Sequence, residues 1–224
     1  DARHLGGRRV VVDERPRAGQ NVRIVGEDVR RDEPLLEAGD ILKAQHLELL
    51  AGQGMTGIEV RRNVRVGLIS TGTELREPGQ PLHPGQIFNS NRVMLRASLD
   101  ACSWAKVLDF GIVPDTRVAI AGGLAEASTR CDAIVTTGGV SAGEEDHVTW
   151  AVSTGGGVID VMKVAMRPGK PVKVGRLGPA LFLGLPGNPN ATLVTFRMIA
   201  LPALRKLAGL SHTAPSWTKA VADF

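Results

Sequence analysis

The chain has 224 residues, of which 43% are hydrophobic and 22% are charged, and its formal net charge is +4 at pH 7. This length and composition are typical of a folded protein, and we expect one domain of about 150 residues and a smaller one. No apolar run approaches the roughly 20 residues that span a bilayer. The first residues lack the apolar segment of a signal peptide, so we expect a cytoplasmic protein with no membrane partner.

Cysteines and basic residues exclude further classes of protein. Cys102 and Cys131 have neither CxxC spacing nor a nearby histidine cluster, which favours buried thiols over a disulfide, a metal site or a nucleophile. The basic residues are scattered apart from Arg61, Arg62 and Arg65, and no aromatic-interleaved basic stripe accompanies them. We therefore expect no nucleic-acid partner, and an acidic small molecule explains the positive charge equally well.

Composition divides the chain into four segments. Residues 1–20 are polar and arginine-rich, and we interpret them as a linker or the end of a missing inserted domain. Residues 21–62 carry short apolar runs between turn signals, with a short helix at 44–53 and a return strand near GIEV, which predicts a small mixed β-rich domain. Residues 63–210 form the main domain, and 211–224 are expected to lead towards a missing C-terminal β domain.

Strands and helices alternate from residue 64 onward. The predicted strands are VRVGLIS, AKVLDFG, CDAIVTT, GVIDVMKV, PVKVG and ALFLGL. The predicted helices cover about 90–102, 115–129, the segment from the acidic loop to about 153, and 190–208. This alternation predicts an α/β fold with a mostly parallel sheet and helices on both faces.

A glycine-rich loop, TTGGVSAGEED at 136–146, follows the predicted strand CDAIVTT. Its glycines allow successive N–H groups to converge on phosphate oxygens, and its three acids would repel a phosphate unless a hard cation such as Mg²⁺ lay between them. The glycines are Gly138, Gly139 and Gly143, and the acids are Glu144, Glu145 and Asp146. The loop suits a metal-bridged phosphate, although a loop of this kind also simply turns the chain in many α/β proteins.

Other candidate residues follow other predicted strands, at the edge where ligands bind in open parallel sheets. Glu74 in STGTEL is a candidate, or an ordinary acid of a first helical turn. Asp115 in GIVPD is a candidate, or a helix cap. Lys170 in RPGKP is a natural phosphate partner, or a solvated loop residue. Asp28 in GEDV would by itself be a surface acid.

These motifs together resemble a known family. STGTEL, GQIFNSN, GIVPD, TTGGVSAGEED, AMRPGKP and GLPGNP, in this order, are similar to the molybdopterin molybdotransferases and to the corresponding domain of gephyrin. The resemblance covers about residues 19–210, and it includes GQNVRIVGEDV and LLEAGDIL of the smaller segment.

The resemblance implies a reaction and a set of site residues. Family members take adenylylated molybdopterin and molybdate, cleave the phosphoanhydride with help from Mg²⁺ or Zn²⁺, release AMP and leave molybdenum on the dithiolene. The implied catalytic residues are Asp28, Glu74, Asp115 and Asp146, with Glu74 and Asp146 at the metal. The implied ligand-binding residues are Thr137, Gly138, Gly139, Val140, Ser141, Gly143, Lys170, Pro186, Gly187, Asn188 and Pro189. A homodimer and a partner adenylyltransferase are also implied.

Two positions depart from the family pattern. Thr73 stands where the family commonly has an aspartate, and Ala191 stands where it commonly has a serine associated with molybdate. Two alternatives therefore stay open: an adenylyltransferase acting on molybdopterin with ATP, and a non-catalytic molybdopterin-binding or scaffold protein. The segment 21–62 weighs against the first, because adenylyltransferases lack it.

Overall fold

The computed structural model describes residues 2–4, 10–12, 15, 17–139 and 146–221. The chain divides into two compact units, Asp1–Glu37 and Ala38–Phe224. In the first unit, β1 (Ala2–His4) and β2 (Val10–Val12) pair as an antiparallel hairpin. The candidate residues at the carboxyl ends of the predicted strands, which we call the strand-end site, belong to the second unit, whereas Asp28 belongs to the first.

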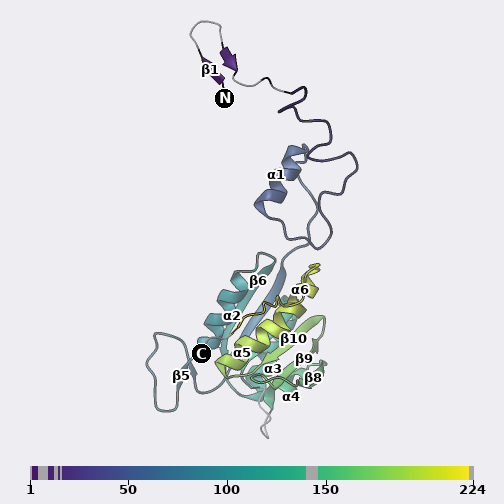
Figure 1. Ribbon diagram of the computed structural model, residues 1–224. Helices are drawn as coiled ribbons and strands as arrows, with labels where there is room; N and C mark the ends of the chain where they lie inside the picture. The colour runs from purple at the N-terminus through teal and green to yellow at the C-terminus, as the bar shows by residue number, and fades with distance from the viewer. Residues whose placement is uncertain (1, 5–9, 13–14, 16, 140–145, 222–224) are drawn as a thin grey trace. The chain divides into compact units, whose positions relative to one another are not determined.

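A six-stranded sheet forms the centre of the second unit (Figure 1), with the strand order β6-β3-β7-β10-β9-β8. The strands are β3 (Val64–Thr71), β6 (Ala105–Val113), β7 (Ala133–Thr137), β8 (Val158–Lys163), β9 (Pro171–Leu177) and β10 (Ala180–Leu185). Neighbours from β6 to β10 run parallel, whereas β9 is antiparallel to both β10 and β8. The predicted, mostly parallel sheet is confirmed.

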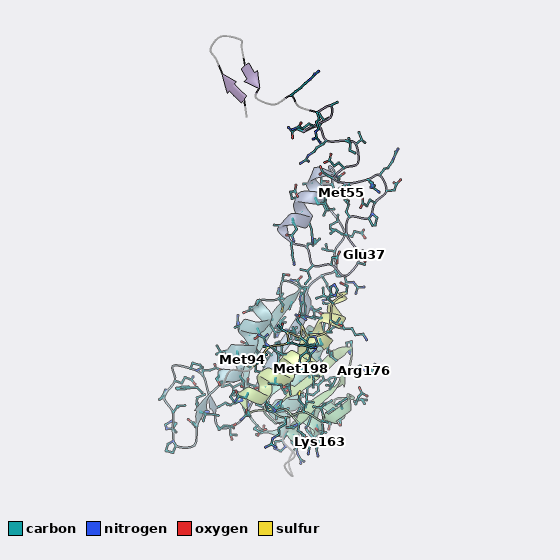
Figure 2. The ribbon with its side chains drawn as sticks, viewed as in Figure 1. Glu37, Met55, Met94, Lys163, Arg176 and Met198 are labelled. Atoms are coloured by element: carbon teal, nitrogen blue, oxygen red, sulfur yellow. The ribbon has the colours of Figure 1, made fainter. Side chains whose placement is uncertain are left out.

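Helices cover both faces of this sheet. On one face lie α2 (Ser90–Asp100), α5 (Pro189–Thr195), the π-helical turn η1 (Phe196–Ala200) and α6 (Leu201–Ala208), and on the other lie α3 (Arg117–Arg130) and α4 (His147–Thr154). Figure 2 labels Met94 of α2 and Met198 of η1 within the first layer, Lys163 on the edge strand β8 and Arg176 on the neighbouring strand β9. Because both faces are covered, the central strands read as nearly continuous apolar runs.

Two apolar clusters hold these layers together. Leu95 of α2 and Phe196 of η1 pack in the cluster that contains Leu68 of β3. On the other face, Leu124 of α3 packs in the cluster that contains Phe182 of β10. The sheet is therefore rigid along its central strands, and the loops at their carboxyl ends start from fixed points.

Three smaller elements complete the described chain. A short parallel pair, β4 (Leu75–Arg76) and β5 (Ile87–Phe88), lies between β3 and α2 in the sequence. Helix α1 (Ala44–Gly52) matches the short helix expected at 44–53. Of the helices that the structure describes, none is both long and apolar enough to cross a membrane.

The segment 21–62 differs from its prediction. Throughout this stretch, all of which the structure describes, α1 is the one helix or strand, and the return strand expected near GIEV is irregular chain. Asn21, Gly26 and Asp32 adopt positive φ and turn the chain at short intervals, and no described strand pairs with the apolar runs between them. The boundary between compact units also falls after Glu37, inside the segment assigned to one small domain.

Candidate functional site at the carboxyl ends of the parallel strands

The chain makes a tight turn at Gly138 and Gly139, directly after β7. Their φ angles are +85° and +63°, a region that favours glycine. A Cβ at Gly138 would lie 2.1 Å from the backbone oxygen of Thr71, and one at Gly139 would lie 2.7 Å from Cγ2 of Val148. Side chains are therefore excluded here by contact as well as by backbone conformation. The half-buried turn therefore presents main chain without side chains at the carboxyl end of β7, as a phosphate cradle requires.

The loop Pro186–Pro189, which follows β10, lies beside this turn. A Cβ at Gly187 would be 3.8 Å from the Cα of Gly138, so the two predicted ligand-binding loops are in contact range. Asn91 of α2 donates a hydrogen bond from Nδ2 to the Gly187 oxygen at 2.7 Å, and Thr192 Oγ1 donates to the Pro186 oxygen at 2.6 Å. These two bonds fix the loop from both sides.

The same loop starts helix α5. Asn188 is the N-cap residue, and its Oδ1 accepts a hydrogen bond from the Ala191 N–H at 3.2 Å. Pro189 occupies the first turn, where its missing N–H costs no helical bond. The predicted roles of Pro186 and Pro189 as shaping residues are thus compatible with their positions, and Asn188 has a structural task in the cap.

Asp146 is the N-cap of α4 and also the partner of a buried lysine. Its Oδ1 accepts from the Thr149 N–H at 2.9 Å, and its Oδ2 accepts from Thr149 Oγ1 at 2.7 Å and from Lys173 Nζ. Lys173 Nζ also donates to Thr149 Oγ1 at 2.6 Å. The Lys173 side chain is only 2% exposed, and a buried ammonium is tolerated only when it is paired.

Lys173 and Asn91 were not among the residues expected at the site. The one sequence signal for Lys173 is a lysine between two valines of the apolar strand PVKVG. Asn91 lies in the GQIFNSN motif, but nothing local indicates its bond to Gly187, which is 96 positions away.

Glu74 and Asp115 occupy the loops after β3 and β6. Glu74 is exposed, and a Cβ at Gly72 would lie 2.6 Å from its Oε2. Asp115 is partly buried, and it does not cap α3. The N-cap is Thr116, whose Oγ1 accepts from the Ala119 N–H at 3.3 Å. The helix-cap reading of Asp115 is therefore wrong, because the helix begins two residues later than expected.

An open depression of about 670 Å³ joins these two loops. Its lining residues are Gly72, Thr73, Leu75, Arg76, Glu77, Gln80, Ile112 and Pro114. The structure thus brings together the STGTEL and GIVPD motifs at one edge of the sheet. This depression and the Gly138 turn both lie at the carboxyl end of β3.

An arginine beside the depression is held by two acids. Arg92 Nε lies 2.7 Å from Asp109 Oδ1, and Arg92 Nη1 lies 2.6 Å from Glu77 Oε2. Burial works against ionisation of Asp109, but hydrogen bonds from Arg92, the Gly111 N–H and Arg96 outweigh it and hold the pKa of this carboxyl below its ordinary value. Asp109 of β6 is therefore ionised at neutral pH and ties α2 to the edge strand.

Two hydroxyl groups at this edge lack partners. Thr71 Oγ1 and Thr136 Oγ1 are buried and form no hydrogen bond within the part of the chain that the structure describes. Thr71 Oγ1 would lie 2.8 Å from a Cβ at Gly139, so it faces the glycine turn. Buried polar groups are normally satisfied. A ligand oxygen at the turn would satisfy Thr71.

Asp28 and Lys170 form contacts of their own, and several other predicted residues lie outside the part of the chain that the structure describes. Asp28 belongs to the Asp1–Glu37 unit, where Oδ2 accepts from Arg23 Nη1 at 2.6 Å. Lys170 is exposed, and its backbone oxygen accepts from the Val164 N–H at 2.9 Å. Val140, Ser141 and Gly143, and with them Glu144 and Glu145, lie outside the described residues.

The described residues do not form a ready site for a divalent ion. Among them, no three His, Cys, Asp or Glu side chains gather closely enough to hold a metal. Of the two acids predicted to bind it, Asp146 already accepts hydrogen bonds on both oxygens and contacts an ammonium.

Comparison with known proteins gives a consistent result. Residues 67–206 match the model of a family described as "Probable molybdopterin binding domain". A molybdopterin molybdenumtransferase of Haemophilus influenzae is 40% identical over 200 residues, which are 89% of this chain and 49% of that protein. One from Nostoc sp. is 39% identical over 206 residues, 91% of this chain and 47% of that protein. The chain thus spans about half the length of the curated relatives that it matches.

Solved structures show the same likeness. The crystal structure of a molybdopterin biosynthesis moea protein from Pyrococcus horikosii matches with a TM-score of 0.71 and 28% identity, covering 82% of this chain and 45% of that chain. A second moeA structure, from Pyrococcus horikoshii, matches with a TM-score of 0.64 and 26% identity, covering 84% of this chain and 44% of the other.

Proposed function

Because the chain belongs to the family of molybdopterin-binding domains and is confirmed as similar to the molybdopterin molybdenumtransferases, we propose that it is a molybdotransferase of molybdenum cofactor biosynthesis. It takes adenylylated molybdopterin and molybdate, cleaves the phosphoanhydride, releases AMP and leaves molybdenum on the dithiolene. Its substrates are thus a small pterin and an oxyanion, which suit the net positive charge.

One observation supports this proposal above the others: the loops after β3, β7 and β10 meet at one edge of the sheet. Gly138 contacts Thr71, and Gly187 lies against Gly138. Phosphoanhydride cleavage depends mostly on positioning and on charge neutralisation. The backbone turn and the Thr71 hydroxyl, which has no partner among the described residues, supply donors for phosphate oxygens, and fixed loops supply the positioning.

The chain's own residues take separate tasks in this proposal. The N–H groups of the Gly138–Gly139 turn and the Thr71 hydroxyl bind phosphate oxygens. Asn91 and Thr192 hold the Pro186–Pro189 loop against the turn. Glu74 and Asp115 lie in the two loops that line the depression after β3 and β6, and they orient the second substrate from there.

Magnesium or zinc, implied by the resemblance, stays a prediction. Asp146 is bonded to Thr149 and Lys173, and the described residues do not fit a metal held by Glu74 and Asp146.

The assembly and location are also part of the proposal. We infer a cytoplasmic homodimer in which the segment 21–62 of one subunit helps to close the site of the other. This arrangement gives Asp28 a task despite its distance in sequence. An adenylyltransferase that supplies the adenylylated pterin is the expected partner enzyme.

The direct test is AMP release from adenylylated molybdopterin, measured with and without molybdate. We expect molybdate-dependent release, and we expect Glu74→Gln and Asp146→Asn to lower it at least about tenfold. Asp100→Asn and Glu126→Gln are matched controls, because these acids form exposed ion pairs within single helices. Pyrophosphate formation from ATP would instead indicate an adenylyltransferase, and tight binding without release would indicate a scaffold.

A further inference from the structure

The Asp146 carboxylate already has a cation beside it. Lys173 reaches it from β9, and its Nζ contacts both Asp146 Oδ2 and Thr149 Oγ1. The lysine side chain is 2% exposed and that of Asp146 is 23% exposed, so the ammonium approaches from inside the protein and the carboxylate is the outer member of the pair.

The sheet explains how a lysine can lie there. Lys173 is directly opposite Gly184 of β10, so the two residues share one face of the sheet. Gly184 carries no side chain that would compete with the stem of Lys173 on this face. Lys173 Nζ contacts Thr149 of α4 there, whereas the neighbouring Val172 packs in the cluster on the opposite face.

The negative charge of Asp146 stabilises the buried ammonium of Lys173. Burial of a cation is costly, and the N-terminus of α4 carries a partial positive charge of its own. Asp146 offsets both effects, because it is the cap of that helix and the partner of Lys173. A divalent cation on the same carboxylate would lie next to an ammonium in a poorly solvated place, where like charges repel strongly.

We propose that Lys173 is the resident cation of the strand-end site, a positioning residue that occupies the Asp146 carboxylate in place of a divalent metal ion. Lys173 holds Asp146 against Thr149 and supplies positive charge at the start of α4. Asp146 then acts as a fixed structural anion at the end of the glycine-rich loop and not as a metal ligand.

Ion binding tests this inference without any catalytic assay. Mn²⁺ binding to the whole chain is titrated by electron paramagnetic resonance in the parent, in Lys173→Met and in Lys173→Arg. We expect Lys173→Met to bind Mn²⁺ about tenfold more tightly, because it frees the carboxylate and removes a like charge at contact distance. Lys173→Arg keeps the charge and should stay within about twofold of the parent. Equal or weaker Mn²⁺ binding by Lys173→Met overturns the inference.

A double variant covers the case in which Lys173→Met does not fold. Asp146→Asn combined with Lys173→Met replaces the ion pair by neutral groups of similar shape, a change that buried pairs often tolerate. Since Asp146 is not a ligand in the parent, the Mn²⁺ affinity of the double variant should stay within about twofold of the parent value. A loss of fivefold or more, on the order of 1 kcal/mol, would show that Asp146 binds the ion and would overturn the inference.

The expected effect on catalysis rests on the proposed function, whereas the ion titrations do not. In Lys173→Met, the ratio of AMP release with Mg²⁺ to release without it should exceed the parent ratio. A chain that shows the Mn²⁺ result without AMP release would contradict the proposed transferase and leave the role of Lys173 standing. Release by both proteins with equal Mg²⁺ ratios would count against Lys173 as the resident cation.

Discussion

At the scale of single residues, Gly138 is where the site depends most on the absence of a side chain. Gly138→Ala places a Cβ 2.1 Å from the Thr71 oxygen, and that neighbour is backbone and cannot rotate away. We expect a loss of about 2–4 kcal/mol in the free energy of unfolding, from contact and from left-handed strain together. Urea denaturation measures the loss, and AMP release should fall with it.

Gly156→Ala is the matched control for this change. Gly156 has a similar φ of +77°, but a Cβ there would meet nothing within 4 Å. Only the left-handed strain of about 1–2 kcal/mol applies. If the two variants lose equal stability, the close approach of Gly138 to Thr71 does not constrain the turn.

The sequence located some of these residues and missed others for a physical reason. Gly138 and Gly139 could be predicted, because glycine repeats after a buried strand are a local signal. Asn91 could not, because its contact with Gly187 depends on how α2 packs beside α5. Lys173 could not either, since its burial follows from the register of β9 against Gly184.

At the scale of elements, helix α5 stabilises the loop that precedes it. Thr192 is fully buried, and its Oγ1 donates to the Pro186 oxygen at 2.6 Å and contacts the Asn188 oxygen at 2.8 Å. Thr192→Val keeps the shape but leaves the Pro186 oxygen without this donor. We expect a loss of about 1–3 kcal/mol in thermal or urea unfolding, and weaker binding of adenylylated molybdopterin.

Thr195→Val, one turn along the same helical segment, isolates the effect of the loop. Thr195 is equally buried, but the partners of its Oγ1 in the described part of the chain are helix oxygens, those of Ala191 at 2.7 Å and Thr192 at 3.1 Å. Its loss should cost less stability and leave ligand binding unchanged. Equal binding losses in both variants would mean that the Pro186 bond has no special part in shaping the loop.

Helices and strands with a clear periodicity of apolar residues could be predicted, whereas elements that depend on partners distant in the sequence could not. The six predicted main-sheet strands are all present, and 190–208 is helical throughout, although η1 interrupts its α-helical bonding between α5 and α6. GIEV has strand composition but no strand beside it, because extended chain becomes a stable strand only when another chain segment pairs with it. Asp115 was a candidate for the N-cap of α3, but the next residue, Thr116, is the N-cap.

At the scale of the whole molecule, Asp132 ties together the starts of β3 and β7 at the edge opposite the candidate site. It accepts hydrogen bonds from Arg62 at 2.6 and 2.8 Å, and from the Arg65 backbone N–H at 2.8 Å and its Nη2 at 3.0 Å. The hydrogen bonds from Arg62 outweigh the effect of burial and hold the pKa of the Asp132 carboxyl far below its ordinary value. Ionised Asp132 therefore stabilises the sheet as a unit.

Asp132→Asn should make the fold less stable at neutral pH and less sensitive to acid. A carboxyl whose folded pKa is depressed contributes fully above its unfolded pKa of about 4, and the contribution declines as the pH falls towards the folded pKa. At pH 7 we expect a loss of about 1–3 kcal/mol, since charge-assisted bonds to a partly buried acceptor are lost. Melting temperatures measured from pH 7 to pH 2 should converge with those of the parent only below about pH 4.

Asp100→Asn sets the baseline for that comparison. Asp100 lies 3.5 Å from Arg96 on one helix, and both side chains are more than half exposed, so its removal should change stability by less than about 0.5 kcal/mol at any pH. A constant gap between Asp132→Asn and the parent from pH 7 to pH 2 would contradict the linkage, because a pH-independent loss is what altered packing produces. A difference in melting temperature that narrows as the pH falls would show that the acid sensitivity arises at Asp132, between β3 and β7. The same two strands lead to Thr71 and Gly138 at their other ends.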